Sequence, residues 1–237
     1  TLRVLNSSIK NNVEQIIVTS SIVAMFRKPN RSNPYTFGEN DWTDENWIEG
    51  VSDYFLSKTR AERRSWEFME SKGLKNKLTT INPGGVFGDA LDKKGGTSIE
   101  YVRQFLKGKF PAAPKFAVLI SDVKDVAKSH VACIGNKKVG GRRLIIGKEV
   151  KKLVELSQIM AEAMPEYAKK VPKKELPNFM VKLISYIDSS AKTMIPDLGI
   201  MMQTDSTYAE DLLGFKFKGA KDCISENAKS VVKLGLV

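Results

Sequence analysis

The spacing of apolar residues changes repeatedly along the chain and predicts strands and helices in alternation. Short apolar runs of the kind found in buried parallel strands occupy residues 15–19, 77–81, 116–120 and 141–147. Apolar residues three or four positions apart predict helices over residues 2–9, 52–73, 98–106 and 122–134. Strands that alternate with helices are typical of an α/β fold with a mostly parallel sheet.

Two longer stretches depart from this pattern. Residues 27–50 are polar and rich in Pro, Asn and Gly, and we expect them to form a long loop. From residue 151 onward the pattern is mainly helical, with interruptions at prolines. We expect residues 151–237 to form a helical lobe that is not an independent domain.

Composition and charge narrow the classes of function. With 42% hydrophobic and 27% charged residues, the 237-residue chain has the composition of a globular protein. Its net charge of +11 would suit nucleic acid, but no basic stripe carries the interleaved aromatic residues that stack on bases. We therefore expect a solvated, lysine-rich surface and no nucleic-acid partner. An anionic cofactor or substrate would also benefit from the positive field.

Membrane and metal sites are not expected either. No apolar run approaches the ~20 residues that cross a bilayer. Cys133 and Cys223 lie far apart and suggest neither a disulfide framework nor a zinc site, which fits a reducing cytoplasm. His130 is the only histidine, so a multi-histidine metal centre is excluded.

A tyrosine and a lysine at helical spacing are the first candidates for chemistry. Tyr54 and Lys58 are four residues apart and therefore share one face of the predicted helix. A free tyrosine titrates near pH ~10, and a nearby cation favours the phenolate and lowers that pKa. The pair could therefore exchange a proton near neutral pH. An ordinary exposed helical pair is the alternative.

Small polar residues at strand ends supply further candidates. Ser20 and Ser21 follow the strand at residues 15–19, and a Pro-Gly-Gly turn at residues 83–85 follows the next strand. Ligands of open α/β sheets bind at the carboxyl ends of the strands. A serine at this edge could donate a hydrogen bond to a substrate carbonyl while a tyrosine exchanges a proton with the same oxygen. The same residues could also simply terminate a strand or set a turn.

Together, these motifs resemble the extended short-chain dehydrogenase/reductases. The resemblance is closest to the branch of dihydroflavonol, cinnamoyl-CoA and aldehyde reductases. It rests on residues 18–21 (VTSS), 40–44 (NDWTD), 54–62 (YFLSKTRAE), 81–88 (INPGGVFG), 121–127 (SDVKDVA) and 211–215 (DLLGF). Lys124 replaces the usual arginine of the fifth segment. The match runs almost from end to end of the chain.

The resemblance implies a division of the chain. Residues 1–150 would be the remaining part of a Rossmann-type NAD(P)-binding domain, the C-terminal part of a doubly wound parallel sheet. A substrate-loop insertion would lie around residues 88–115. Residues 151–237 would be the mainly helical substrate-binding lobe.

The resemblance also implies an activity and a set of catalytic residues. The protein would use NAD or NADP to reduce an aldehyde or ketone to an alcohol. Tyr54 would be the general acid, and Lys58 would lower its pKa and bind the nicotinamide ribose. Ser21 would orient the carbonyl, and Ser20 is the less favoured candidate for that role.

Further residues would bind the cofactor. Pro83, Gly84 and Val86 would line the nicotinamide through backbone contacts, and Thr19 and Ser20 would add to the same site, next to Tyr54 and Lys58. NADP is slightly favoured over NAD by the family branch. A small carbonyl compound is the expected substrate, and a homodimer is compatible with the resemblance.

Two other functions are compatible with this fold. A nucleotide-sugar epimerase or dehydratase is the first, but related dehydratases place an Asp-Glu pair after the strand-end serine, where this chain has Ile22 and Val23. A non-catalytic NAD(P)-sensing protein is the second. Such relatives tend to lose the tyrosine or the lysine, and both are present here.

The phosphate-binding glycine turn of dinucleotide folds is not found in the sequence. The chain also begins with Thr1 rather than methionine, so we expect that residues upstream are missing. The glycine turn and the helix after it hold the pyrophosphate of the cofactor. We therefore expect the chain as printed to show marginal solubility and no tight binding of NAD or NADP.

Overall fold

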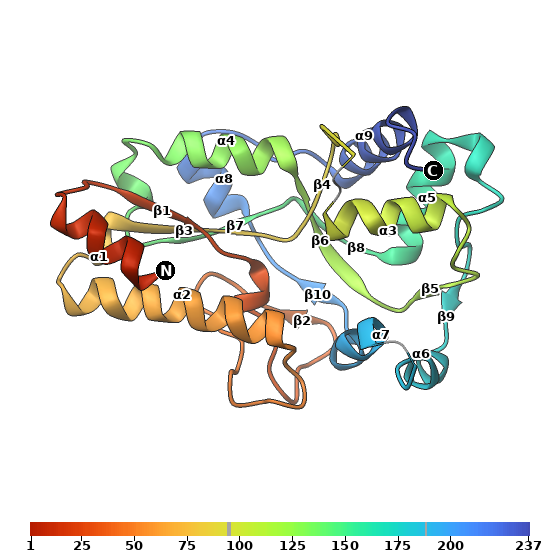
Figure 1. Ribbon diagram of the computed structural model, residues 1–237, viewed down its shortest axis with the longest axis horizontal. Helices are drawn as coiled ribbons and strands as arrows, with labels where there is room; N and C mark the ends of the chain where they lie inside the picture. The colour runs from red at the N-terminus through yellow and green to blue at the C-terminus, as the bar shows by residue number, and fades with distance from the viewer. Residues whose placement is uncertain (94–95, 188) are drawn as a thin grey trace.

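A three-stranded parallel sheet forms one half of the molecule (Figure 1). The computed structural model describes residues 1–93, 96–187 and 189–237. The sheet has the order β1-β3-β7 and consists of β1 (Ile16–Thr19), β3 (Leu78–Pro83) and β7 (Arg143–Ile146). Every residue of the central strand β3 is buried, as expected for a parallel strand that is covered on both faces.

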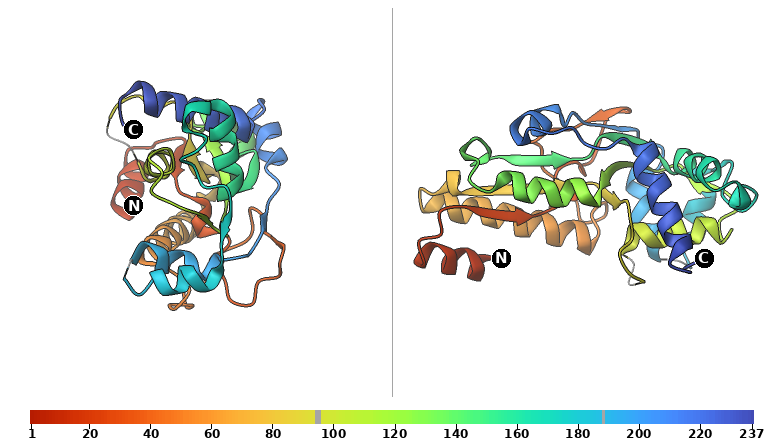
Figure 2. Two further views of the ribbon diagram at one scale, coloured as in Figure 1. Left: turned by 90° about the vertical axis from the view of Figure 1, so that its right-hand side faces the viewer. Right: turned by 90° about the horizontal axis from the view of Figure 1, so that it is seen from above.

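Helices cover both faces of this sheet, as the views in Figures 1 and 2 show. They are α1 (Leu2–Lys10), α2 (Asp53–Ser71), α4 (Val123–Cys133) and α8 (Thr207–Leu213). The contact of α1 and α2 with the sheet is a cluster of Leu5, Ile16, Trp66, Met69 and Leu78. On the other face, α4 and α8 pack through a cluster that includes Ile81, Cys133, Leu144, Ala209 and Leu213. The two clusters make this half a three-layer α/β structure.

A second, mixed sheet forms the other half. It consists of β4 (Gly85–Phe87), β6 (Ala117–Asp122) and β8 (Glu149–Lys152). β4 pairs with β6 in parallel, and β6 pairs with β8 in antiparallel orientation. Three helices pack around it, α3 (Thr97–Leu106), α5 (Leu153–Ala163) and α9 (Ala220–Lys233). Their shared apolar cluster includes Val102, Phe105, Leu106, Ile120, Leu156 and Ile224.

Two further strand pairs are very short. β2 (Tyr35–Thr36) pairs with β10 (Met202–Gln203), and β5 (Ala113–Pro114) pairs with β9 (Glu175–Leu176). The remaining helices are α6 (Asn178–Ile184) and α7 (Ser189–Met194). Single 3₁₀ turns are η1 (Ile22–Ala24), η2 (Lys75–Lys77), η3 (Lys137–Val139), η4 (Pro165–Tyr167) and η5 (Ile195–Asp197).

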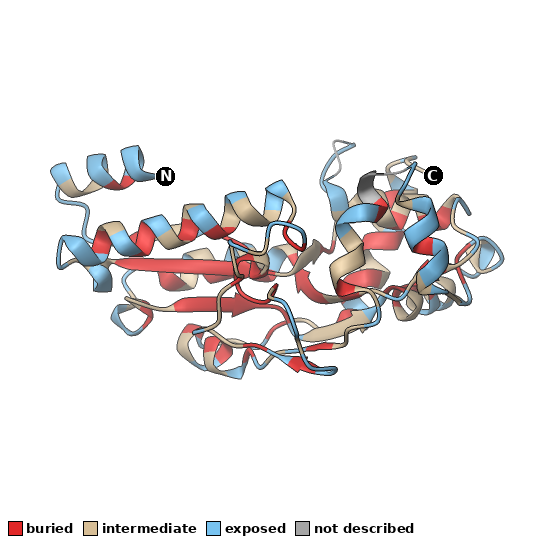
Figure 3. Cartoon of the chain, turned by 90° about the horizontal axis from the view of Figure 1, so that it is seen from below, coloured by how far each residue is buried: buried red, intermediate tan, exposed pale blue. Residues whose placement is uncertain are grey.

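The α/β fold with mostly parallel strands is confirmed, and buried residues concentrate in the strands and on the inward faces of the helices (Figure 3). The predicted strands and helices of the first 150 residues are present, with ends that shift by one or two residues. The predicted loop at residues 27–50 contains β2, whose partner lies more than 160 residues away. The antiparallel strand β8 was not predicted, because its lysine-rich sequence carries no apolar run.

The structure leaves the proposed boundary at residue 151 as a prediction. α8 comes from the second part of the chain, yet it packs on β7 and α4 of the first sheet. In the part of the chain that the structure describes, no helix combines the length and apolar character needed to span a bilayer.

Candidate active site

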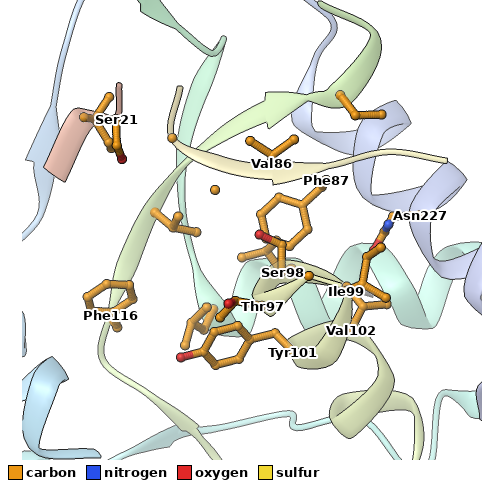
Figure 4. A pocket seen from close by; sticks show the side chains of 18 of the residues that line it. Ser21, Val86, Phe87, Thr97, Ser98, Ile99, Tyr101, Val102, Phe116 and Asn227 are labelled. Carbon is orange, nitrogen blue, oxygen red and sulfur yellow. The ribbon is translucent and has the colours of Figure 1, made fainter. Parts of the chain in front are cut away.

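A cavity of about 820 Å³ opens where the two sheets meet, beyond the carboxyl end of β3. Of the residues predicted from the sequence, it is lined by Ser21, Tyr54, Gly84 and Val86. Figure 4 shows Ser21 at one side of the cavity, Val86 and Phe87 along one wall, and Tyr101 and Phe116 on the opposite side. Ligands in open α/β folds bind at this position relative to the strands.

Tyr54 reaches the cavity because it lies in the first turn of α2. The helix begins at Asp53, an acidic residue that is favourable near the positive end of a helix dipole, and Ser52 holds the N-cap position. Tyr54 is 57% exposed, and its ring packs edge-on against Phe55 with 6.3 Å between the ring centroids. The phenol is therefore accessible from the cavity.

Lys58 lies one turn after Tyr54 and is half-buried. It is not among the residues that line the cavity. Among the described residues, no carboxylate lies within ion-pair distance of its ammonium group. The charge of Lys58 is therefore not neutralised by a described carboxylate.

The two adjacent serines face different surroundings. Ser21 is buried and lines the cavity, and its Oγ accepts a hydrogen bond from the Val23 amide at 3.3 Å, which caps η1. The same Oγ donates to the Pro83 carbonyl at 3.5 Å. Ser20 turns away from the cavity and donates a short hydrogen bond to the Glu62 carboxylate. These positions favour Ser21 over Ser20 as the serine that meets a substrate.

Two other predicted residues also lie outside the cavity lining. Thr19 is exposed, and its Oγ1 lies 2.7 Å from His130 Nε2 on α4. His130 Nδ1 is 2.8 Å from the Val126 carbonyl, which can only accept, so Nδ1 carries the proton and Nε2 accepts from Thr19. Pro83 is buried at the end of β3 and contributes its carbonyl to Ser21.

The turn after β3 brings bare backbone to the cavity wall. A Cβ at Gly84 would lie 2.2 Å from the Leu119 carbonyl oxygen, so only glycine fits at this contact with β6. The Gly84 amide donates to Ser121 Oγ at 2.8 Å, which fixes the turn. The close packing of this turn against β6 thus positions Gly84 and Val86 in the lining of the cavity that Ser21 and Tyr54 also line.

A buried carboxylate that sequence reasoning did not single out holds α2 in place. Glu62 lies two turns after Tyr54 and has no exposed side-chain surface. Its oxygens accept five hydrogen bonds, from Ser20 Oγ, Trp66 Nε1 (3.3 Å), Thr80 Oγ1 (3.2 Å), Asn82 Nδ2 (2.7 Å) and Arg143 Nε (2.6 Å). The donors come from α2, β3, β7 and the end of β1. The carboxylate thus fastens α2 to all three strands of the first sheet.

Arg143 extends this network to the loop at residues 27–50. Its guanidinium lies over the Trp42 ring at 3.7 Å and donates to the carbonyls of Glu39 (2.8 Å) and Asp41 (2.5 Å). A charge-assisted contact of this kind is stronger than a neutral hydrogen bond. The sequence held one signal of this network, because Glu62 continues the four-residue spacing that begins at Tyr54.

The walls of the cavity beyond these groups are mostly apolar. They include aromatic and thioether side chains from both halves of the chain, namely Phe26, Phe55, Phe87, Phe105, Phe116 and Met160. Such a cavity has the size and character of a small-molecule site, with a few polar groups at one end. The arrangement can hold an apolar carbonyl compound with its oxygen between a serine hydroxyl and a phenol.

Comparison with known proteins identifies relatives with reductase activities. No family model matches the chain. The NADPH-dependent methylglyoxal reductase Gre2 of Saccharomyces cerevisiae is 29% identical over 94% of this chain and 65% of its own length. Cinnamoyl-CoA reductase 2 of Arabidopsis thaliana is 25% identical over 98% of this chain and 64% of its own length. The chain thus spans about two thirds of the length of these relatives.

The solved structures that resemble this chain include the yeast reductase that was also found by sequence. The yeast methylglyoxal/isovaleraldehyde reductase Gre2, complexed with NADPH, has a TM-score of 0.76 and 28% identity, and the match covers 99% of this chain and 69% of that one. Vestitone reductase from alfalfa, at 21% identity and a TM-score of 0.74, shares the fold. Over nearly its whole length the chain is therefore similar to the Gre2-type and cinnamoyl-CoA reductases, in sequence and in fold.

Proposed function

We propose that the protein reduces an aldehyde or ketone to an alcohol with a nicotinamide cofactor, and that the cavity at the end of β3 is where the carbonyl binds. One observation carries this proposal: Tyr54, Ser21 and the bare turn at Gly84 line the same cavity, although they lie on three separate segments. The names of the methylglyoxal and cinnamoyl-CoA reductases support it.

Tyr54, Lys58 and Ser21 would each have a role in proton transfer to the carbonyl oxygen. Ser21 would donate a hydrogen bond to the oxygen, and Tyr54 would deliver the proton as the alcohol forms. Lys58 would stabilise the phenolate that remains through its positive charge. Its ammonium would also donate to the nicotinamide ribose.

The residues present fit the nicotinamide end of a cofactor. Gly84 and Val86 line the same cavity as Tyr54, so the nicotinamide would lie against their backbone. When bound, the reduced cofactor would supply the hydride. Pro83 would add a backbone contact, and Thr19 and Ser20 would support the same site from the end of β1. We propose NADP rather than NAD, since the Gre2 relatives are named as NADPH-dependent.

The proposed setting is the cytoplasm, with a small carbonyl compound as the substrate. Both cysteines are free and buried, which agrees with a reducing compartment. A homodimer is a further proposal that a sedimentation measurement can test.

The reaction type is tested by stoichiometry in the full-length product of the gene that encodes this chain. We expect one equivalent of NADPH to be consumed for each equivalent of aldehyde reduced. Lys58→Ala should in addition weaken NADPH binding, because the ribose contact and the charge are both lost. Redox-neutral conversion of a nucleotide sugar, with no net loss of NADPH, would instead identify an epimerase or dehydratase.

A further inference from the structure

Two arginines and one aspartate form a buried cluster beside the cavity. Arg27 and Arg31 follow η1, and Asp197 ends η5. Arg27 Nη2 pairs with Asp197 Oδ2, and Arg31 Nη1 lies 2.7 Å from Asp197 Oδ1. The three side chains are 1–2% exposed. The cluster therefore joins the loop after β1 to the segment after α7, away from solvent.

Among the described residues, the charges of this cluster do not balance. Two guanidinium groups share one described carboxylate, which leaves one positive charge in excess. The other polar partners are neutral: Thr193 O accepts from Arg27 at 3.1 Å, and Pro196 O accepts from Arg31 at 2.6 Å. Within the described residues, Nε and Nη1 of Arg27 have no hydrogen-bond partner. An uncompensated buried charge is costly, and no second described carboxylate pairs with the cluster, so this arrangement favours a negative group on a ligand.

Only one member of the cluster contributes to the described lining of the cavity. Arg27 lines it together with Phe55, and the guanidinium carbon lies 3.6 Å from the centroid of the Phe55 ring. The ring compensates part of the charge through a cation–π contact. Burial lowers the pKa of Arg27, yet an arginine stays protonated in proteins at any ordinary pH. The excess positive charge is thus present at any ordinary pH, and Arg27 brings it to one wall of the cavity.

The carboxylates in the described lining do not neutralise Arg27. Asp89 and Asp92 come from the segment after β4, and Asp89 is 2.5 Å from Lys124 of α4. The same segment is anchored to α9 by the Ala90 amide, which donates to Ser230. Arg27 is held instead by Phe55 and the segment after α7. Attraction between charges is strong in a low-dielectric wall and is little screened by salt.

We propose that the substrates of this cavity are carbonyl compounds that carry an anionic group, with a carboxylate as the simplest case. The anionic group would lie at the Arg27 wall, beside Phe55, while the carbonyl meets Ser21 and Tyr54. This inference rests on the proposed reductase function and names the class of substrate. Arg27 would then determine specificity, and its substitution would lower activity on anionic substrates more than on neutral ones.

Phenylglyoxylate and its methyl ester form a matched pair of substrates for the full-length gene product. Wild type should favour the acid. Arg27→Met should lower kcat/KM for the acid by roughly 10- to 100-fold more than kcat/KM for the ester, the size expected for a lost contact to a charged group. Lys28→Met is the control, because it removes the same charge from the next residue, whose side chain is 42% exposed. It should leave both substrates unchanged.

Equal losses of kcat/KM for the acid and the ester in Arg27→Met would overturn the proposal and show that the cluster has only a structural role.

A binding measurement on the wild-type protein tests the proposal even if that variant does not fold. Calorimetry on wild type should show tighter binding of phenylacetate than of phenylacetamide, and equal or weaker binding of the carboxylate would overturn the anion site. Preferential carboxylate binding without NADPH-dependent turnover would refute the reductase function and leave the anion site standing. NADPH-dependent turnover without a preference for the carboxylate would support the reductase function and refute the anion site.

Discussion

The sheet β1-β3-β7 and the sheet β4-β6-β8 are held in the fold by different kinds of contact. In the first sheet, side chains from β3, from β7 and from the end of β1 donate hydrogen bonds to Glu62. With Trp66 of α2, this carboxylate has five buried donors. The second sheet is wrapped by α3, α5 and α9 through apolar side chains such as Leu106 and Ile224. Hydrogen bonds fix directions, whereas apolar packing mainly fixes volume. The proposed proton-transfer residues lie on the first side, and much of the apolar cavity wall lies on the second.

The largest loss of stability should follow from the removal of the carboxylate at the first sheet. Glu62→Leu leaves Arg143 buried without its partner, and breaking a buried pair in this way costs about 3–5 kcal/mol. Glu62→Gln should cost less, because the amide oxygen still accepts hydrogen bonds. Urea unfolding curves measure both. A loss below about 1 kcal/mol for the leucine variant would show that the network does not stabilise the fold.

At the second sheet, the volume of the side chain should matter more than its identity. Leu106 is fully buried in the cluster around α3. Leu106→Ala should cost roughly 2–5 kcal/mol through the cavity that it leaves. Leu106→Met keeps the volume and should cost less than about 1.5 kcal/mol. Equal losses for the two variants in the same unfolding assay would mean that shape rather than volume dominates here.

The junction between the sheets should be sensitive to a single methyl group. Gly84→Ala places a Cβ against the backbone of Leu119, and β6 has to shift to receive it. We expect a loss of about 1–3 kcal/mol from overpacking. Gly38→Ala is the matched control, since a Cβ there meets no atom within 4 Å. A Gly84 variant as stable as the Gly38 variant would contradict the close approach.

The smallest expected effect is the reactivity of the two buried thiols, Cys133 beside the first sheet and Cys223 beside the second. Burial raises the pKa of Cys133 to about 11, and burial also raises the pKa of Cys223. A raised thiol pKa keeps the unreactive protonated form until the pH climbs through that value. At pH 8 about one thiol in a thousand is ionised at Cys133, so iodoacetamide should react slowly with the native protein. Rapid labelling without urea would show that the site opens.

The sequence predicted the elements of the first 150 residues well because each carries its own periodicity. The strand at residues 15–19 and the long helix after Ser52 are clear from apolar spacing alone. The pairing of β2 with β10 could not be predicted, because two-residue strands far apart in the sequence have no local signal. β8 was missed for a similar reason, since its register on β6 depends on tertiary contacts.

The candidate site was predictable in part. The spacing of Tyr54 and Lys58 and the serines after β1 indicated two segments, and the structure brings Tyr54 and Ser21 from these segments to one cavity. Which serine faces that cavity depends on the hydrogen bond from Ser20 to Glu62, and no local pattern shows this contact. Arg27 had no signal either, because its burial depends on Asp197, 170 residues away.

The claim that Tyr54 donates the proton is tested most directly by single-turnover oxidation of NADPH with a saturating aldehyde, again in the full-length gene product. Tyr54→Phe keeps the ring and removes the proton, so the rate should fall by roughly 10²–10⁴-fold. Tyr101→Phe is the matched control, because Tyr101 is the other phenol among the described lining residues, and it should react at nearly the wild-type rate. A Tyr54→Phe variant that reacts as fast as wild type would contradict the assignment.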